Sequence, residues 1–200
     1  MTPVAYLYGI DTVAEAIEHE VVGQFVRELI SDEIIPTIDL PKDELESFAD
    51  AVIERFRNPY IQHYLLSISL NSTSKFKTRN LPSLLDYVER KQALPPKMVF
   101  SLAAMIAFYK GKRGEEETIK LSDDPEVLEL FETQWAQSNG SKESLRAIAA
   151  SVLGCESIWD MDLTTVPGLV EEVTDRLYEI ETKGMKRAVE ATLGQRAANQ

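Results

Sequence analysis

The segment Lys97–Lys110 is apolar on almost every side, and it constrains the fold more than any other feature of the chain. A helix formed here would present apolar side chains all the way round its axis, which is typical of a helix that other helices surround. Its longest apolar run, Met98–Tyr109, is interrupted by Ser101 and is too short to cross a bilayer. We therefore expect an all-α bundle with this helix near its centre.

Helical spacing of apolar residues recurs along most of the chain, whereas no run of alternating apolar and polar residues is long enough to predict a sheet. The segment Glu44–Phe56 lies between Pro41 and Pro59, which favours a helix there. Its apolar spacing predicts a face turned to the core, formed by Leu45, Phe48, Ala49, Val52 and Phe56. Further helices are expected at Ile61–Leu70, Pro125–Gln137 and Ser141–Leu153, and along the apolar stripe Val166, Val170, Val173, Leu177 and Ile180.

Composition and length limit what the chain can be and what it can bind. Its 200 residues, 44% of them hydrophobic, suffice for one large domain or two small ones with a proper core. The formal net charge of −12 argues against nucleic acid or an anionic membrane as the partner. A single cysteine, Cys155, cannot form an intramolecular disulfide, and the first residues lack the basic start of a signal peptide. We therefore expect a cytoplasmic protein, and no cluster of His, Cys, Asp and Glu has the spacing of a metal site.

A basic stretch interrupts this acidic chain and is the best candidate for a binding site. Lys75, Lys77 and Arg79 follow one another at every second position, with no acid among them. If Ser72–Asn80 is helical, Lys75 and Arg79 are four residues apart and share one face, while Lys77 lies on another. Two cations on one face could bind a substrate carboxylate. A solvated basic face is the alternative, and charge alone favours it.

Three more residues of this region are candidates for substrate contacts. Asn58 and Asn71 are short amides at expected helix ends, where an amide hydrogen-bonds a sugar hydroxyl or the backbone equally well. His63 lies in a segment rich in Leu and Ile, where a single histidine is more often a structural donor or acceptor than a catalyst.

Three stretches of the sequence point to a known family: RFRNPYIQHYLLSISLN at 55–71, SKFKTRNLPSLL at 74–85 and FSLAAMIAFYKG at 100–111. They resemble the C-terminal domain of the long-chain mannitol dehydrogenases, and the resemblance extends from Thr2 to Val173. RF-x-NPYI looks like an element shared widely in the family, whereas SKFKTR looks like its uronate-reducing branch. Polyol-oxidising members tend to have Asp-Gly-x-Ser before Arg or Lys where this chain has NSTSK at 71–75. The resemblance therefore makes mannitol the less expected substrate.

The resemblance implies a multi-helix bundle over residues 1–200, similar to the C-terminal-like domain of 6-phosphogluconate dehydrogenases, that caps a Rossmann domain. It implies NAD-dependent reduction of tagaturonate to altronate, with NAD bound mainly by that N-terminal domain. This chain lacks such a domain, since its nine glycines include no G-x-G-x-x-G. The family's catalytic Lys, Asn and His precede the region that resembles Thr2. We therefore expect no catalytic and no cofactor-binding residue here, and no activity of the chain alone.

The implied partners are a small-molecule uronate and the chain's own N-terminal Rossmann domain. Among the candidate residues, Lys75 is the best match to the family's substrate site, because the resemblance implies that polyol-oxidising relatives also have a basic residue near the substrate at this position. The substrate contacts expected from the residues and the resemblance together are Lys75, Arg79, Asn71, Asn58 and His63.

The surface that faces the Rossmann domain should be apolar and exposed. We expect it near the N-terminus, at Val4, Tyr6, Leu7 and Tyr8. Two alternatives to the tagaturonate assignment remain at this stage. One is another uronate or polyol dehydrogenase of the family, such as a fructuronate reductase or a mannitol dehydrogenase, and the other is a non-catalytic helical interaction module.

Overall fold

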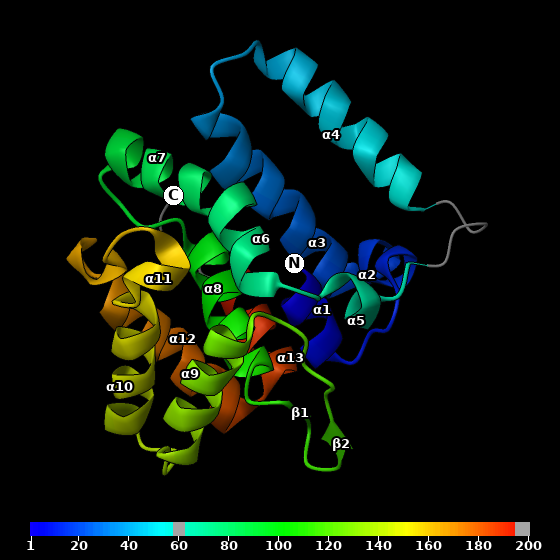
Figure 1. Cartoon of the computed structure of the whole chain (residues 1–200). Coiled ribbons are helices and arrows are strands. Elements are labelled where there is room, and N and C mark those ends of the chain that lie inside the picture. The colour runs from blue at the N-terminus through cyan, green and yellow to red at the C-terminus, as the bar shows by residue number, and fades with distance from the viewer. Residues whose placement is uncertain (58–62, 195–200) are drawn as a thin grey trace.

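The regular secondary structure of the protein is almost entirely helical in its computed structural model, which describes residues 1–57 and 63–194 (Figure 1). The predicted all-α class is confirmed, because the one sheet within these ranges pairs two antiparallel strands of two residues each. In chain order the elements are α1 (Thr2–Tyr8), α2 (Val13–Glu18), α3 (Glu20–Glu28), the π-helix η1 (Leu29–Ile34), the 3-10 helix η2 (Ile35–Thr37), α4 (Lys42–Phe56), α5 (Leu65–Ile68), α6 (Ser72–Arg79), α7 (Leu81–Lys91), α8 (Pro96–Phe108), β1 (Lys112–Arg113), β2 (Glu117–Thr118), α9 (Pro125–Ala136), α10 (Lys142–Leu153), α11 (Glu156–Trp159), the 3-10 helix η3 (Leu163–Thr165), α12 (Leu169–Lys183) and α13 (Met185–Gly194).

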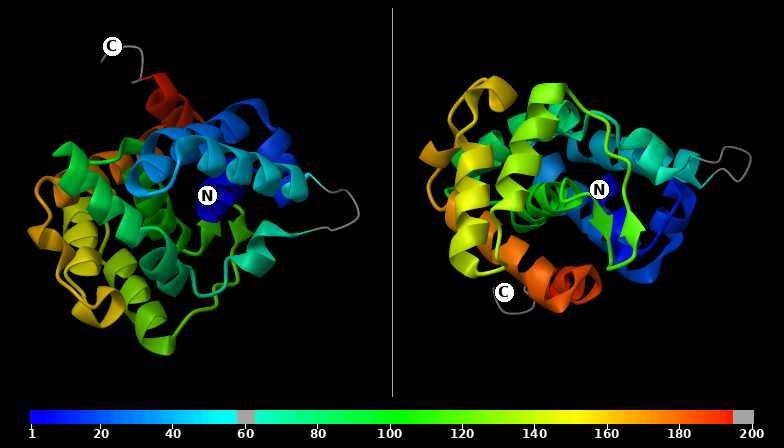
Figure 2. Two further views of the ribbon diagram at one scale, coloured as in Figure 1. Left: turned by 90° about the horizontal axis from the view of Figure 1, so that it is seen from above. Right: turned by 60° about the horizontal axis from the view of Figure 1, so that its bottom comes forward.

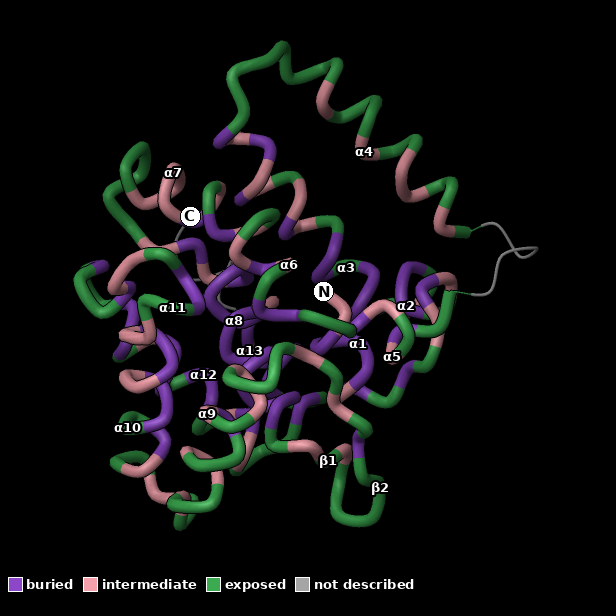
Figure 3. The backbone as a smooth tube through the Cα atoms, viewed as in Figure 1, coloured by how far each residue is buried: buried purple, intermediate pink, exposed green. Residues whose placement is uncertain are grey.

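The central helix of the bundle is α8, as its all-round apolar sequence predicts. Every residue from Lys97 to Phe108 is buried, and α8 packs mainly against α12 and α1. Figure 2 shows other helices around it, and Figure 3 shows its tube buried along its length. The helix expected for the apolar stripe near the C-terminus is α12, in which Val170, Val173 and Leu177 are buried. None of the described helices is long and apolar enough to cross a membrane.

Polar side chains fix where several helices begin. Thr12 Oγ1 accepts a hydrogen bond from the Glu15 N–H, and the Glu15 carboxylate accepts one from the Thr12 N–H at 3.0 Å, a capping box at the start of α2. Ser141 Oγ accepts from the Ser144 N–H at the start of α10, and Asp124 caps α9 in the same manner. These caps stabilise the ends of short helices whose own length gives them little stability.

Helix α4 lies where the sequence predicts it but is not buried as predicted. No residue of α4, all of which is described, is buried, and Phe48, expected in the core, is 68% exposed. The helix stands apart from the rest of the bundle in Figure 1, and its main contacts are with α2 and η2. Ile53 and Phe56, near its C-terminal end, pack partly against the core. The predicted core face is therefore wrong for Phe48, and only its end at Phe56 contacts the core, because helical spacing reveals an apolar face but not what covers it.

The helix predicted at Ile61–Leu70 is shorter in the structure. It comprises Leu65–Ile68, while residues 61 and 62 lie outside the described ranges. Tyr64 is extended instead, because it forms an isolated β-bridge with Thr12, just before α2. The Val13 N–H donates to the His63 carbonyl at 3.0 Å, and this bond ties the segment before α5 to the N-terminal part of the chain.

The prediction of an exposed apolar patch near the N-terminus is also wrong. Val4 is 1% exposed, and Tyr6 and Tyr8 are buried as well. They belong to α1, which packs against α8 and α5 and so forms part of the core. Among the described residues, the large apolar side chains that are most exposed are Phe48 of α4 and Leu40 just before it.

A buried acid and a buried lysine meet at the start of α8. Glu33 of η1 is 1% exposed, and its carboxylate oxygens accept from the backbone N–H of Lys97 at 2.8 Å and of Met98 at 2.7 Å. They satisfy two N–H groups that the start of a helix leaves without intrahelical partners. The Lys97 Nζ lies 3.1 Å from the Glu28 carboxylate and 3.8 Å from that of Asp32. Burial nevertheless raises the pKa of Glu33 to about 7.

We expect Glu33 to make folding stability depend on pH near neutrality. Its folded-state pKa lies above the ordinary 4.5, so between pH 4.5 and about 7 the folded protein holds a proton that the unfolded chain releases. This contribution is complete below pH 4.5 and is lost as the pH rises through about 7. The free energy of unfolding should fall over that interval by on the order of 3 kcal/mol, since one pKa unit corresponds to about 1.4 kcal/mol. Denaturant titrations should show a flatter pH profile for Glu33→Gln.

Asp39→Asn is the matched control for this prediction. Asp39 is an exposed carboxylate that accepts a hydrogen bond from Arg90 at 2.7 Å, and this bond lowers its pKa. It is therefore already ionised across the interval in which Glu33 titrates. Equal slopes of unfolding free energy against pH for the wild type, Glu33→Gln and Asp39→Asn would contradict the role of Glu33.

Candidate functional site

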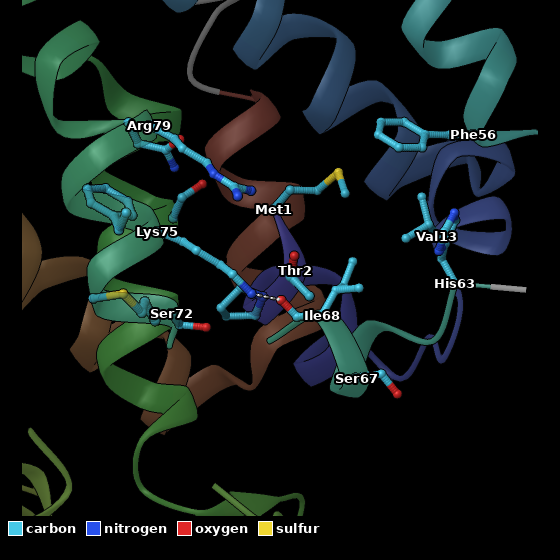
Figure 4. A pocket seen from close by; sticks show the side chains of 15 residues that line it. Met1, Thr2, Val13, Phe56, His63, Ser67, Ile68, Ser72, Lys75 and Arg79 are labelled. Carbon is cyan, nitrogen blue, oxygen red and sulfur yellow. Dashed lines mark hydrogen bonds between the residues drawn. The ribbon is translucent and has the colours of Figure 1, made fainter. Parts of the chain in front are cut away.

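A cavity of about 530 Å³ lies where α1, α5, α6 and α8 come together, beside the end of α4 (Figure 4). Parts of the chain that are far apart in sequence form its walls. They are Met1, Thr2, Pro3, Val13, Phe56, His63, Ser67, Ile68, Ser72, Lys75, Phe76, Arg79, Asn80, Ser101 and Met105.

One face of α6 forms a whole wall of this cavity. Ser72, Lys75, Phe76, Arg79 and Asn80 line it, and their spacing is that of a single helical face. The predicted helix is present, and the face that contains both basic residues is the one turned to the cavity. In Figure 4 Lys75 and Arg79 extend from α6 toward Met1 and Thr2.

The basic residues of α6 have different surroundings. Lys75 is half-buried, and its Nζ donates to the Ile68 carbonyl at 2.9 Å, which holds the ammonium group beside α5. Arg79 is exposed at the rim. Lys77 lies on another face, as its position in the sequence predicts, and forms an ion pair of 2.9 Å with Asp160. In the described part of the chain, no carboxylate lies within ion-pair distance of Lys75 or Arg79.

The lining of the cavity is cationic although the protein is strongly acidic. None of its described residues is Asp or Glu, whereas the chain as a whole has 33 acidic and 21 basic residues. A partly enclosed cavity lined by one sign of charge raises the local concentration of ligands of the opposite sign. The arrangement therefore favours a small anion with hydroxyl groups, because serine hydroxyls, an amide and an imidazole line the remaining polar surface.

Of the other three predicted site residues, one lines the cavity, one does not, and one lies outside the described residues. His63 lines the cavity, where its side chain is available to a ligand. Asn71 is not among the lining residues: it begins α6 in a left-handed conformation with φ of 52°, and its N–H donates to the Ser122 carbonyl at 3.0 Å. That backbone role explains an Asn at this position, since Asn tolerates positive φ better than most residues do. Asn58 lies outside the described residues.

Sequence reasoning missed several residues of the cavity. Ser72 and Asn80 fall on the same helical face as Lys75 and Arg79, so the spacing of three and four could have identified them. Ser101 is the polar interruption in the apolar segment of α8, which is a weaker signal. The contributions of Met1 and Phe56 depend on how α1 and α4 pack, and no local pattern reveals them.

The described residues do not suggest a metal or dinucleotide site. They contain no group of three or more His, Cys, Asp or Glu side chains that could hold a metal ion. Dinucleotide binding of the Rossmann type needs parallel strands joined through helices, and the described part of the chain contains only the antiparallel pair β1–β2.

Comparison with known proteins identifies the family. The family described as "Mannitol dehydrogenase C-terminal domain" matches residues 1–181. The chain belongs to this family. It is 50% identical to an altronate oxidoreductase of Pectobacterium carotovorum over 194 residues, which cover 95% of this chain and 40% of the relative. It is also 50% identical to an altronate oxidoreductase of Bacillus subtilis over 190 residues, which cover 95% of this chain and 37% of that relative.

A solved structure shows the same fold. Mannitol 2-dehydrogenase of Pseudomonas fluorescens, in a ternary complex with NAD and D-mannitol, matches 96% of this chain and 37% of its own with a TM-score of 0.82 and 16% identity. The family membership and the bundle implied by the sequence resemblance are thus confirmed. The chain spans about two fifths of the length of the curated relatives that it matches.

Proposed function

We propose that this chain is the substrate-binding C-terminal domain of an NAD-dependent oxidoreductase that reduces tagaturonate to altronate. The observation that supports this most is the cavity whose one wall presents Lys75 and Arg79 without an opposing acid. Substrate and product each have a carboxylate, which two cations bind better than they bind a neutral polyol. The altronate oxidoreductases that are 50% identical to this chain support the same substrate class.

In this proposal Lys75 and Arg79 hold the substrate carboxylate at the α6 wall. The hydrogen bond from Lys75 to the Ile68 carbonyl fixes the ammonium group before the ligand binds. This lowers the conformational entropy lost on binding. His63 and Asn80 face the same cavity and are placed to hydrogen-bond hydroxyl groups of the sugar acid. These contacts orient the substrate, and the nicotinamide, when bound, supplies the hydride.

The proposed partner within the intact protein is an N-terminal Rossmann domain that binds NAD. The relatives are more than twice as long as this chain, and the matching family is described as a C-terminal domain. Met1, Thr2 and Pro3 line the cavity, so a preceding domain would join the bundle directly beside the substrate site. Helix α4 ends beside the cavity at Phe56, and its exposed apolar residues, such as Phe48, suit a domain contact.

A turnover assay with the intact protein tests the proposal. With NADH as reductant, tagaturonate should give the highest kcat/KM in a panel that also contains fructuronate and fructose. If fructuronate is the best substrate, the protein is a fructuronate reductase. If fructose is the best substrate, the proposed carboxylate site is contradicted. The 200-residue chain alone should neither turn over substrate nor bind NADH in calorimetry. If no member of the panel reacts, a non-catalytic binding module becomes the better description.

A further inference from the structure

Ser101 is the exception among the buried hydroxyl groups of the described chain. Seven serine and threonine residues are buried there, and the side-chain hydroxyl groups of the other six have hydrogen-bond partners. Within α12 and α13, for example, Thr174 and Thr192 donate to the carbonyl four residues back, at 2.6 and 2.9 Å. Ser101 is 2% exposed, and its Oγ has no partner among the described residues.

An unpartnered buried hydroxyl costs folding free energy, and α8 offers an easy way to avoid that cost. Ser101 could donate to the Lys97 carbonyl one turn back, as helical serines commonly do, or be replaced by alanine, which suits this apolar helix. Neither is found here: position 101 is a serine, and its hydroxyl group does not donate to the Lys97 carbonyl. Instead Ser101 lies at the one place where α8 reaches the cavity, together with Met105 one turn further on.

We propose that Ser101 is a specificity residue of this site, whose hydroxyl group hydrogen-bonds a hydroxyl group of the bound sugar acid. This inference rests on the proposed function for the class of ligand, which is a polyhydroxylated carboxylate. Ser101 belongs to α8, the buried central helix of the bundle, whereas Lys75 and Arg79 belong to α6. The carboxylate and the hydroxylated carbon chain are thus held by different helices. A serine hydroxyl rotates freely and both donates and accepts, so it suits a ligand hydroxyl.

The experiment measures ligand binding and stability in the intact protein with Ser101→Ala. The ligands are altronate and altritol, the neutral hexitol of the same configuration. Affinity for both should fall about 2- to 10-fold, which is the usual effect of one neutral hydrogen bond, while the unfolding midpoint should stay the same or rise. Thr174→Val is the matched control: it removes a buried hydroxyl that does not line the cavity, and it should leave both affinities unchanged while lowering the unfolding midpoint, because it also removes a hydrogen bond.

Each outcome decides the inference separately from the proposed function. Unchanged affinity in Ser101→Ala, or a loss for altronate alone, overturns the hydroxyl contact even if the wild type reduces tagaturonate. A loss accompanied by a lower unfolding midpoint overturns it as well, because that result marks a structural role. If the wild type binds altronate through Ser101 but reduces no uronate, the inference stands and the proposed function fails. If the wild type binds neither ligand, both fail.

Discussion

Lys75→Met in the intact protein should reduce kcat/KM for tagaturonate about 10- to 150-fold, and much less for any neutral ketose that the protein accepts. A charge-assisted hydrogen bond to a carboxylate contributes roughly 1.5–3 kcal/mol, which corresponds to that range. The half-buried ammonium group, held by the Ile68 carbonyl, is the cation best placed to make such a bond. Arg79→Met should show a smaller effect of the same kind, because Arg79 is exposed and water screens its charge.

Lys77→Met is the matched control on the same helix. Lys77 points away from the cavity and pairs with Asp160, so its loss removes one positive charge from α6 without changing the site. Turnover of charged and neutral substrates should remain nearly equal to the wild type. Lys75→Arg should retain part of the preference for tagaturonate, since the charge is kept while the geometry changes. Equal losses for charged and neutral substrates in Lys75→Met would show that Lys75 supports the fold or binds hydroxyl groups.

The sequence predicts those parts of the structure that depend on residues close together in the chain. The burial of α8 follows from its own composition, and Lys75 and Arg79 share a face because a helix repeats every 3.6 residues. The face of α4 that contains Phe48 was predicted in the same manner, and here the prediction failed. Periodicity shows that an apolar face exists, whereas its burial depends on a neighbour that the local sequence does not specify.

The remaining parts of the site depend on tertiary packing. Met1 reaches the cavity because α1 packs against α8 and α5, and Phe56 reaches it because the end of α4 returns to the bundle. The sequence predicts Asn71 as a substrate contact from its amide side chain and its position at an expected helix end, but its backbone conformation gives it another role. The sequence analysis does not predict the role of Glu33. Acidic residues are normally exposed, so no local pattern indicates a buried one that caps a central helix.

Lys97→Met should destabilise the protein by about 3 kcal/mol, the lower end of the range for breaking a buried ion pair. The Lys97 side chain is 5% exposed and lies beside Glu28 and Asp32, with Glu33 bonded to its own backbone N–H. Removing this one cation leaves three acids close together at the start of α8. Glu28 and Asp32 keep some contact with water, which is why the lower end applies. For a chain of this size the unfolding midpoint should fall by roughly 6–12 °C.

The cause is the missing charge, not the changed shape, because methionine fills nearly the same volume as lysine. Adding Glu28→Gln to Lys97→Met should therefore restore part of the lost stability, since it removes one of the acids that Lys97 neutralised. Lys142→Met is the control: Lys142 and Asp175 form an ion pair whose side chains are each 53% exposed, and its loss should barely change the unfolding midpoint. If Lys97→Met and Lys142→Met unfold at the same temperature, the buried cluster does not stabilise the start of α8. If the double variant is less stable than Lys97→Met, Glu28 stabilises the fold by contacts other than its charge.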